Sequence, residues 1–137
     1  VNGVYQAAKK QLATHLFEGF DFTQSPRQQF QEFWHRLRSF SHANPKRFRF
    51  LELQDHLPYL DTTSRKIERD VLSPILAFCE SARSAGITRD LPPEALMALI
   101  WGAFVGLVKA QDTGYISVTD NMFAAAECAC WDMFCAS

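Results

Sequence analysis

The stretch that decides the fold of this chain is Ala95–Val108, which reads ALMALIWGAFVGLV and contains no charged side chain. It falls short of the roughly 20 apolar residues that a helix needs to cross a bilayer. A helix at the surface of a soluble protein has a polar face opposite its apolar one. Because this stretch has no polar face, we expect a helix that is covered on all sides.

The last helical stretch, from Thr119-Asp120 to about Phe134, has nearly the same character. A chain of 137 residues can cover one such helix at its centre, but hardly two when the second lies at its C-terminus. We therefore expect both helices to pack inward on one side and against a second copy on the other, in a four-helix bundle about a two-fold axis. The predicted interface residues of this homodimer are Ala98, Gly102, Val105, Gly106, Met122, Ala126, Ala129 and Met133.

Two glycines in the first of these helices admit two interpretations. Gly102 and Gly106 are four residues apart beside Ala98 and Ala103, so they would let the backbones of two copies approach closely. They could equally give room to a bulky neighbour of the same chain. The sequence leaves both interpretations open.

The rest of the chain also has apolar residues at helical period, and no stretch alternates like a strand. In the N-terminal half we predict three helices. The first covers Val4–Glu18, the second opens at Ser25-Pro26 with Ser25 as its N-cap, and the third covers Lys46 to about His56.

The C-terminal half adds three more helices. The fourth begins around Asp61–Thr63 and ends at Ala85, where Gly86 closes it. Pro74 lies inside this helix and predicts a kink or a break near Leu72–Ser73. The fifth begins at Asp90-Leu91-Pro92-Pro93 and reaches about Gln111, and the sixth is the last helix described above. The predicted fold is all-α, with one six-helix domain over residues 1–137.

Composition and charge narrow the possible functions. The net charge is −1, and the 14 basic and 15 acidic residues form no basic stripe, so this chain alone should bind nucleic acid poorly. There is no glycine-rich phosphate loop, nucleophile elbow or buried carboxylate pair, which argues against an enzyme. Nothing in the sequence requires a cofactor.

The four cysteines do not form the pattern of a disulfide framework. Cys128, Cys130 and Cys135 lie in one predicted helix, where Cys130 points about 200° away from Cys128, so the three cannot bind one metal ion together. We expect free thiols in a reducing cytoplasm. The N-terminus has no signal-peptide pattern.

Two segments resemble the C-terminal regulatory domain of TetR-family repressors. The first is NPKRFRFLE (Asn44–Glu52) followed by LPYL (Leu57–Leu60), and the second is GITRDLPPE (Gly86–Glu94) followed by GAFVGL (Gly102–Leu107). The resemblance implies a bacterial transcription regulator that acts as a homodimer and responds to a small hydrophobic effector. It also implies that the Val4–Glu18 helix connects to a helix-turn-helix domain, which nothing in this chain matches, so DNA would be bound only through that missing part.

If a ligand pocket exists, aromatic and aliphatic side chains of the central helices should line it, with two polar side chains to orient the ligand. The candidates are Phe33, Trp34, Leu37, Phe50, Leu53, His56, Tyr59, Phe78 and Trp101. A row of Phe and Trp at helical spacing is also typical of a plain hydrophobic core, although twelve Phe and three Trp exceed what a bare scaffold needs. A dimerisation or scaffold module without a ligand is therefore the alternative.

Overall fold

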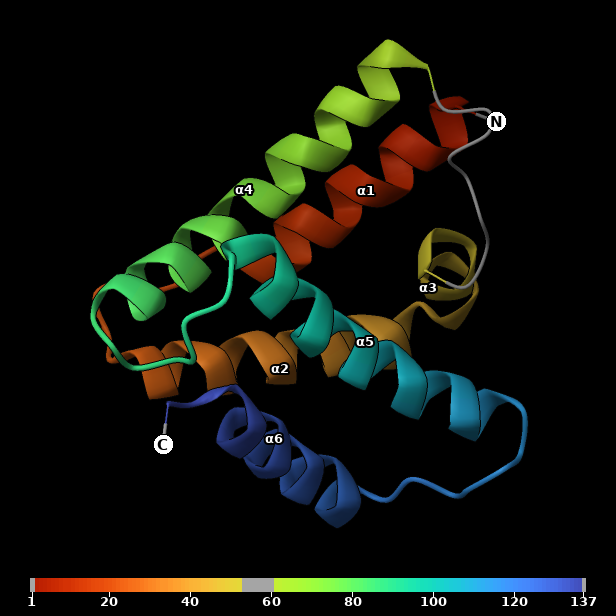
Figure 1. Cartoon of the computed structure of the whole chain (residues 1–137). Coiled ribbons are helices and arrows are strands. Elements are labelled where there is room, and N and C mark those ends of the chain that lie inside the picture. Colours follow the sequence, from red (N-terminus) through yellow and green to blue (C-terminus); the bar gives the residue numbers. More distant parts are fainter. Residues whose placement is uncertain (1, 53–60, 137) are drawn as a thin grey trace. The chain divides into compact units, whose positions relative to one another are not determined.

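The structure, a computed structural model, describes residues 2–52 and 61–136, and in them it contains helices and no strand. The helices are α1 (Asn2–Phe17), α2 (Pro26–Ala43), α3 (Pro45–Glu52), α4 (Thr62–Ser84), α5 (Pro93–Asp112) and α6 (Asp120–Phe134) (Figure 1). The all-α prediction is confirmed, and the helix ends agree with the sequence to within a few residues. The predicted end of α3 near His56 lies outside the described residues.

Contacts within the chain divide it into two compact units, Val1–Pro74 and Ile75–Ser137. The first unit contains α1, α2, α3 and the first half of α4. The second contains the second half of α4 with α5 and α6.

Helix α2 begins where the sequence predicts, because Ser25 forms a capping box. The Ser25 hydroxyl accepts a hydrogen bond from the backbone N–H of Gln28, and the Gln28 side chain accepts one from the backbone N–H of Ser25. Pro26 occupies the first helical position, where its missing N–H has no consequence. The apolar stripe of the helix is buried: Phe30, Phe33, Trp34, Leu37 and Phe40.

The C-terminal end of α1 is tied to α2 by Arg36. Its guanidinium donates to the backbone carbonyls of Leu16 (3.1 Å) and Glu18 (2.6 Å), and it also pairs with Glu32 one turn earlier on α2. The chain leaves α1 at Gly19, whose φ of 68° favours glycine. A cation at these carbonyls satisfies acceptors that the helix itself cannot.

The N-terminal end of α1 is tied to α4 by side-chain hydrogen bonds. Asn2 Oδ1 accepts from the Ser64 hydroxyl (2.9 Å) and from the backbone N–H of Asp61 (3.0 Å). Gln6 donates to the Ser64 hydroxyl (3.1 Å), and the Tyr5 hydroxyl donates to the Glu68 carboxylate (2.9 Å). Ser64 is completely buried, so the contact between α1 and α4 has a buried polar group at this end of α1.

The sequence predicts a kink or a break near Leu72–Ser73. Pro74 does not break α4, so the predicted break is wrong. The helix is continuous from Thr62 to Ser84 with Pro74 inside it. A proline removes one N–H donor and crowds one carbonyl, but the intact turns on both sides hold the helix. The division between the two units falls directly after this residue.

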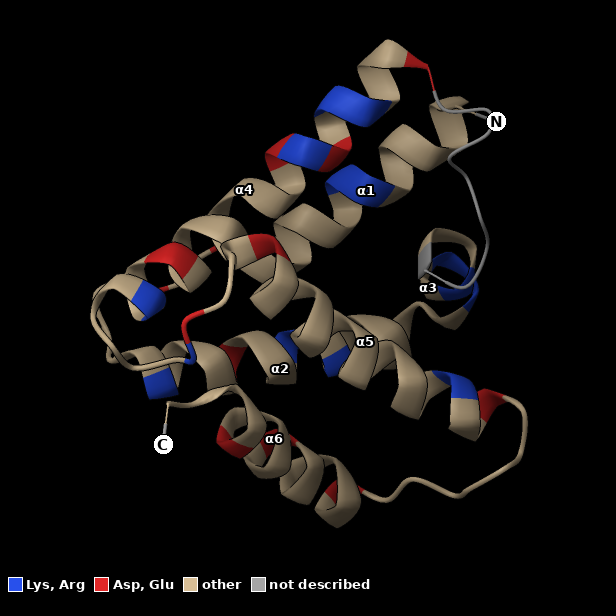
Figure 2. Cartoon of the chain, viewed as in Figure 1, with Lys and Arg blue, Asp and Glu red and all other residues tan. Residues whose placement is uncertain are grey.

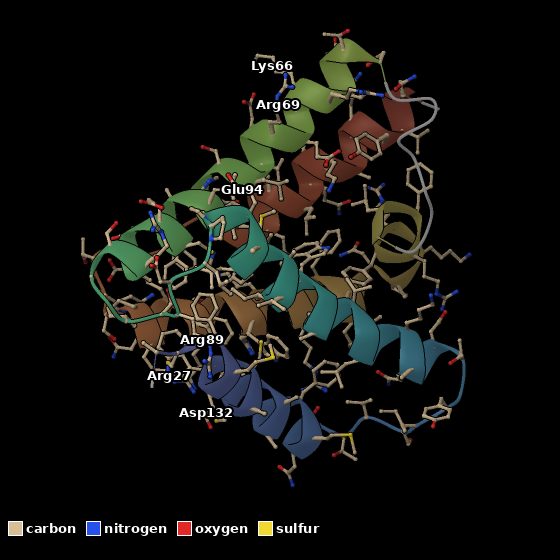
Figure 3. The ribbon with its side chains drawn as sticks, in the orientation of Figure 1. Arg27, Lys66, Arg69, Arg89, Glu94 and Asp132 are labelled. Atoms are coloured by element: carbon tan, nitrogen blue, oxygen red, sulfur yellow. The ribbon has the colours of Figure 1, made fainter. Side chains whose placement is uncertain are left out.

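The second unit is closed by backbone hydrogen bonds between the segment after α4 and the end of α6. Ile87 accepts from the backbone N–H of Ala136 (3.0 Å), and the backbone N–H of Arg89 donates to Phe134 (3.1 Å). The Arg89 side chain donates to the carbonyl of Met133 (2.8 Å), at the negative end of the α6 dipole (Figure 3). Phe104 of α5 and Phe123 of α6 lie 6.1 Å apart, so aromatic packing joins the two helices.

The capping box of α2 gives a test of the fold. Ser25→Ala should lower the free energy of unfolding by about 1 kcal/mol, because it leaves a helix N–H without its acceptor. Urea denaturation followed by circular dichroism measures the change. Ser39→Ala, at an exposed interior position of the same helix, should cost nothing. Equal losses in the two variants would show that the cap does not stabilise α2.

Candidate functional site

Helix α5 buries one face and exposes the opposite one. Leu96, Ile100 and Phe104, four residues apart, are buried. On the other side Ala98, Gly102 and Gly106 are exposed, with Val105 half-buried beside them. Leu99 adds a large aliphatic side chain that is 40% exposed. The exposed face of α5 is therefore apolar and composed mainly of small residues.

Helix α6 continues this pattern. It buries Phe123, Cys130 and Phe134, but Met122 is 40% and Met133 is 44% exposed. Between the two methionines lie Ala126, which is half-buried, and Ala129, which is exposed. Figure 2 shows few charged residues on α5 and α6, and those of α5 lie toward its ends. The eight interface candidates thus lie on two helices of one unit, and none of them is buried. We call them the α5–α6 face.

The whole of α5 is long and apolar enough to cross a membrane, whereas its uncharged stretch Ala95–Val108 is too short to do so. The helix has 20 residues. Its most apolar window of 18 residues has a mean hydropathy of 1.4, and 17% of the residues in this window are buried. The core helix of a soluble protein can pass the same test. Few residues of α5 are fully buried, and the others are half-buried or exposed.

The ligand-pocket candidates are placed in several parts of the chain. Phe33, Trp34 and Leu37 lie on α2 and are buried. Phe33 stacks on Phe17 of α1 at 6.5 Å, and Trp34 stacks on Phe30 at 6.1 Å. These contacts belong to the core of the first unit.

The remaining candidates lie on other helices or outside the described residues. Phe50 of α3 is half-buried in the first unit. Phe78 of α4 and Trp101 of α5 are half-buried in the second unit. Leu53, His56 and Tyr59 lie outside the described residues.

Phe50 lines a hollow between α1 and α3 in the first unit. The hollow has a volume of about 400 Å³, and Gly3, Val4, Ala7, Ala8, Lys46 and Arg47 are its other lining residues. We call it the α1–α3 groove. Of its lining, sequence reasoning selected only Phe50. The other lining residues could have been found from two sequence features: the small residues Gly3, Ala7 and Ala8 on the first helix, and the adjacent cations Lys46 and Arg47 on the third.

Ionisable groups with shifted pKa values do not form a reactive centre. Burial raises the pKa of the Cys79 thiol to about 12, and burial together with the Glu127 carboxylate raises that of Cys130 to about 11. Both thiols are therefore poor nucleophiles and metal ligands at neutral pH. No three His, Cys, Asp or Glu residues in the described part of the chain are grouped to hold a metal ion.

Comparison with known proteins identifies the family. The family described as "Tetracyclin repressor-like, C-terminal domain" matches residues 5–135, and the chain belongs to it. It is a transcription-regulator family, and no protein with a curated description matches the chain by sequence.

Solved structures of similar fold carry the same family name. A TetR family transcription regulator from Marinobacter aquaeolei VT8 has a TM-score of 0.83 at 17% identity, over 97% of this chain and 70% of that one. A TetR family transcriptional regulator from Vibrio parahaemolyticus has a TM-score of 0.79 at 18% identity, over 99% and 74% of the two chains. A third, from Shewanella sp. PV-4, has a TM-score of 0.74 at 14% identity, over 99% and 73%.

The cysteines give a test of this part of the structure. In the native chain at pH 8, iodoacetamide should alkylate Cys128, which is exposed, more than about a hundredfold faster than Cys79, because little Cys79 is ionised. Peptide mass spectrometry after timed quenching measures both rates. In 8 M urea the two rates should converge. Fast native modification of Cys79 would mean that it is not buried as described.

Proposed function

We propose that this chain is the effector-sensing and dimerisation domain of a bacterial TetR-type regulator, with its two units acting as one domain. Two copies pair through the α5–α6 face. A small hydrophobic effector shifts α1, which connects to a helix-turn-helix that this chain does not contain, and this shift controls operator binding in the cytoplasm.

The exposed apolar face of α5 and α6 carries this proposal. Leu99, Met122 and Met133 each expose two fifths or more of their surface on helices that otherwise present small residues. Large apolar side chains exposed together on a protein surface are typical of an interaction site. Because the chain belongs to a family of transcription regulators, a second copy is a better partner for this face than a bilayer.

The two glycines of α5 support pairing between copies. A Cβ atom built on Gly102 or on Gly106 meets nothing within 4 Å in the described part of the chain. No described neighbour in this chain therefore requires the space that these glycines leave. Close approach of a second α5 does require it.

Introducing a charge on one side of α6 tests the dimer. Ala129→Glu should produce a monomer, because it places a carboxylate in the centre of the apolar interface. Ala124→Glu is the matched control: Ala124 is also exposed, but lies about 140° around the same helix. Light scattering coupled to size-exclusion chromatography should give a dimer for the parent and the control. A dimeric Ala129→Glu variant, or a monomeric parent, would reject the interface.

The effector part of the proposal rests on the aromatic side chains of the central helices and on the way α1 is held. Phe78 and Trp101 are half-buried and leave surface that a hydrophobic ligand can cover. The hydrogen bonds of Asn2 and Gln6 to Ser64 fix α1 against α4 in one register. A ligand that favours a second register would move α1 as a rigid element.

Native mass spectrometry tests the effector directly. We expect the purified dimer to carry the extra mass of a co-purified small molecule, and Trp101→Ala to lose it. Trp131→Ala, which truncates another half-buried tryptophan, on α6, should keep the extra mass. Dimers of all three proteins without added mass, even after exposure to a hydrophobic compound library, would favour the scaffold alternative.

A further inference from the structure

We propose that the α1–α3 groove is a second binding site, and that it takes a monocarboxylate with an apolar body, such as a medium-chain fatty acid. Of the candidate effector residues, this groove contains Phe50 but none of the buried stripe of α2. Its described lining residues come from α1 and α3 of the first unit.

The walls of the groove fit an apolar body. Val4 is 63% exposed although it is a β-branched aliphatic residue, and Phe50 is half-buried opposite it. Gly3, Ala7 and Ala8 keep the α1 side of the groove open, because none has a side chain long enough to fill it. At about 400 Å³ the groove lies at the small end of the range of about 300–1,000 Å³ in which proteins bind small molecules.

The rim of the groove is positively charged. Lys46 and Arg47 line it from the first turn of α3, and that turn has no acidic residue (Figure 2). Cations usually avoid a helix N-terminus, because the helix dipole already places positive charge there. Neither side chain has a carboxylate partner in the part of the chain that the structure describes. An anion at this rim would therefore meet positive charge that no described carboxylate neutralises.

The hydrogen-bonding groups of the lining select the head group of the ligand. Among the described lining residues, the polar side chains are Lys46 and Arg47, which donate hydrogen bonds and accept none. The Arg47 guanidinium is held toward α1 by a hydrogen bond to Gln11 Oε1, which leaves its other N–H groups for a ligand. A carboxylate accepts such bonds at both oxygens and donates none. A neutral alcohol gains no charge-assisted bond in the same groove.

Titration of the full chain with decanoate, below its micelle concentration, tests the site. Isothermal titration calorimetry should show binding, and the methyl signals of Ala7 and Ala8 should shift in a ¹H–¹³C NMR spectrum. Decanol has a similar chain without the charge and should bind at least about tenfold more weakly, since a hydrogen bond to a charged group is worth about that factor. Equal binding of the two compounds, or no binding of decanoate, would overturn the proposal.

Two sets of variants separate this groove from other apolar surfaces of the chain. Lys46→Ala combined with Arg47→Ala should weaken decanoate binding at least about tenfold. Arg69→Ala removes an exposed cation of α4 and should change nothing (Figure 3). Gly3→Leu should block the groove without straining the backbone, because its Cβ meets no atom within 4 Å and its φ is not positive, whereas Gly3→Ala is too small to block it. Decanoate affinity that survives both the double variant and Gly3→Leu would place the ligand elsewhere and reject the site.

Discussion

The need to cover the apolar surfaces of α5 and α6 is the constraint on which the rest of this molecule depends. Each helix buries one face within the chain, and the buried faces meet through Phe104 and Phe123. The other faces have almost no polar side chain with which to meet water. Leaving them exposed would cost on the order of 25 cal/mol for each Å² of apolar surface that association could bury. In the proposed dimer, association of two copies would remove that cost, and it would fix the symmetry within which an effector acts.

The first unit is held together differently. Its core is aromatic, with Phe30, Phe33 and Trp34 of α2 packed beside α1. At the two ends of α1 the contacts are hydrogen bonds: Arg36 at the C-terminal end, and Ser64 with Asn2 and Gln6 at the N-terminal end. Directional bonds of this kind favour discrete positions of a helix over a continuum. Interdigitated apolar side chains act in the same sense, because a packed helix cannot slide without repacking them.

Helix positions could be predicted from the sequence because their signals are local. Ser25-Pro26 begins a helix through its own side chain and ring, and Gly86 ends one through its positive φ of 74°. Pro74 was misjudged in part, because its local effect is to break a helix whereas the turns on either side keep α4 continuous. The pocket candidates were harder to judge, since a phenylalanine at helical spacing looks the same whether it fills a core, as Phe33 does, or lines a groove, as Phe50 does. The α1–α3 groove itself depends on which helices become neighbours, and no short stretch of sequence carries that information.

The small side chains of the α5–α6 face have a consequence for partner choice. A bacterium that holds several regulators of one family must keep each subunit from pairing with its paralogues. In the proposed dimer this discrimination cannot come from charge, because the face has almost none. It would come from steric exclusion: where Gly102, Gly106 and Ala129 allow two backbones close together, any paralogue with a larger residue at one of these positions clashes. Faithful self-association would then be nearly independent of ionic strength, and a paralogue with a larger residue at one of these positions would need a compensating smaller residue opposite it before its own copies could pair.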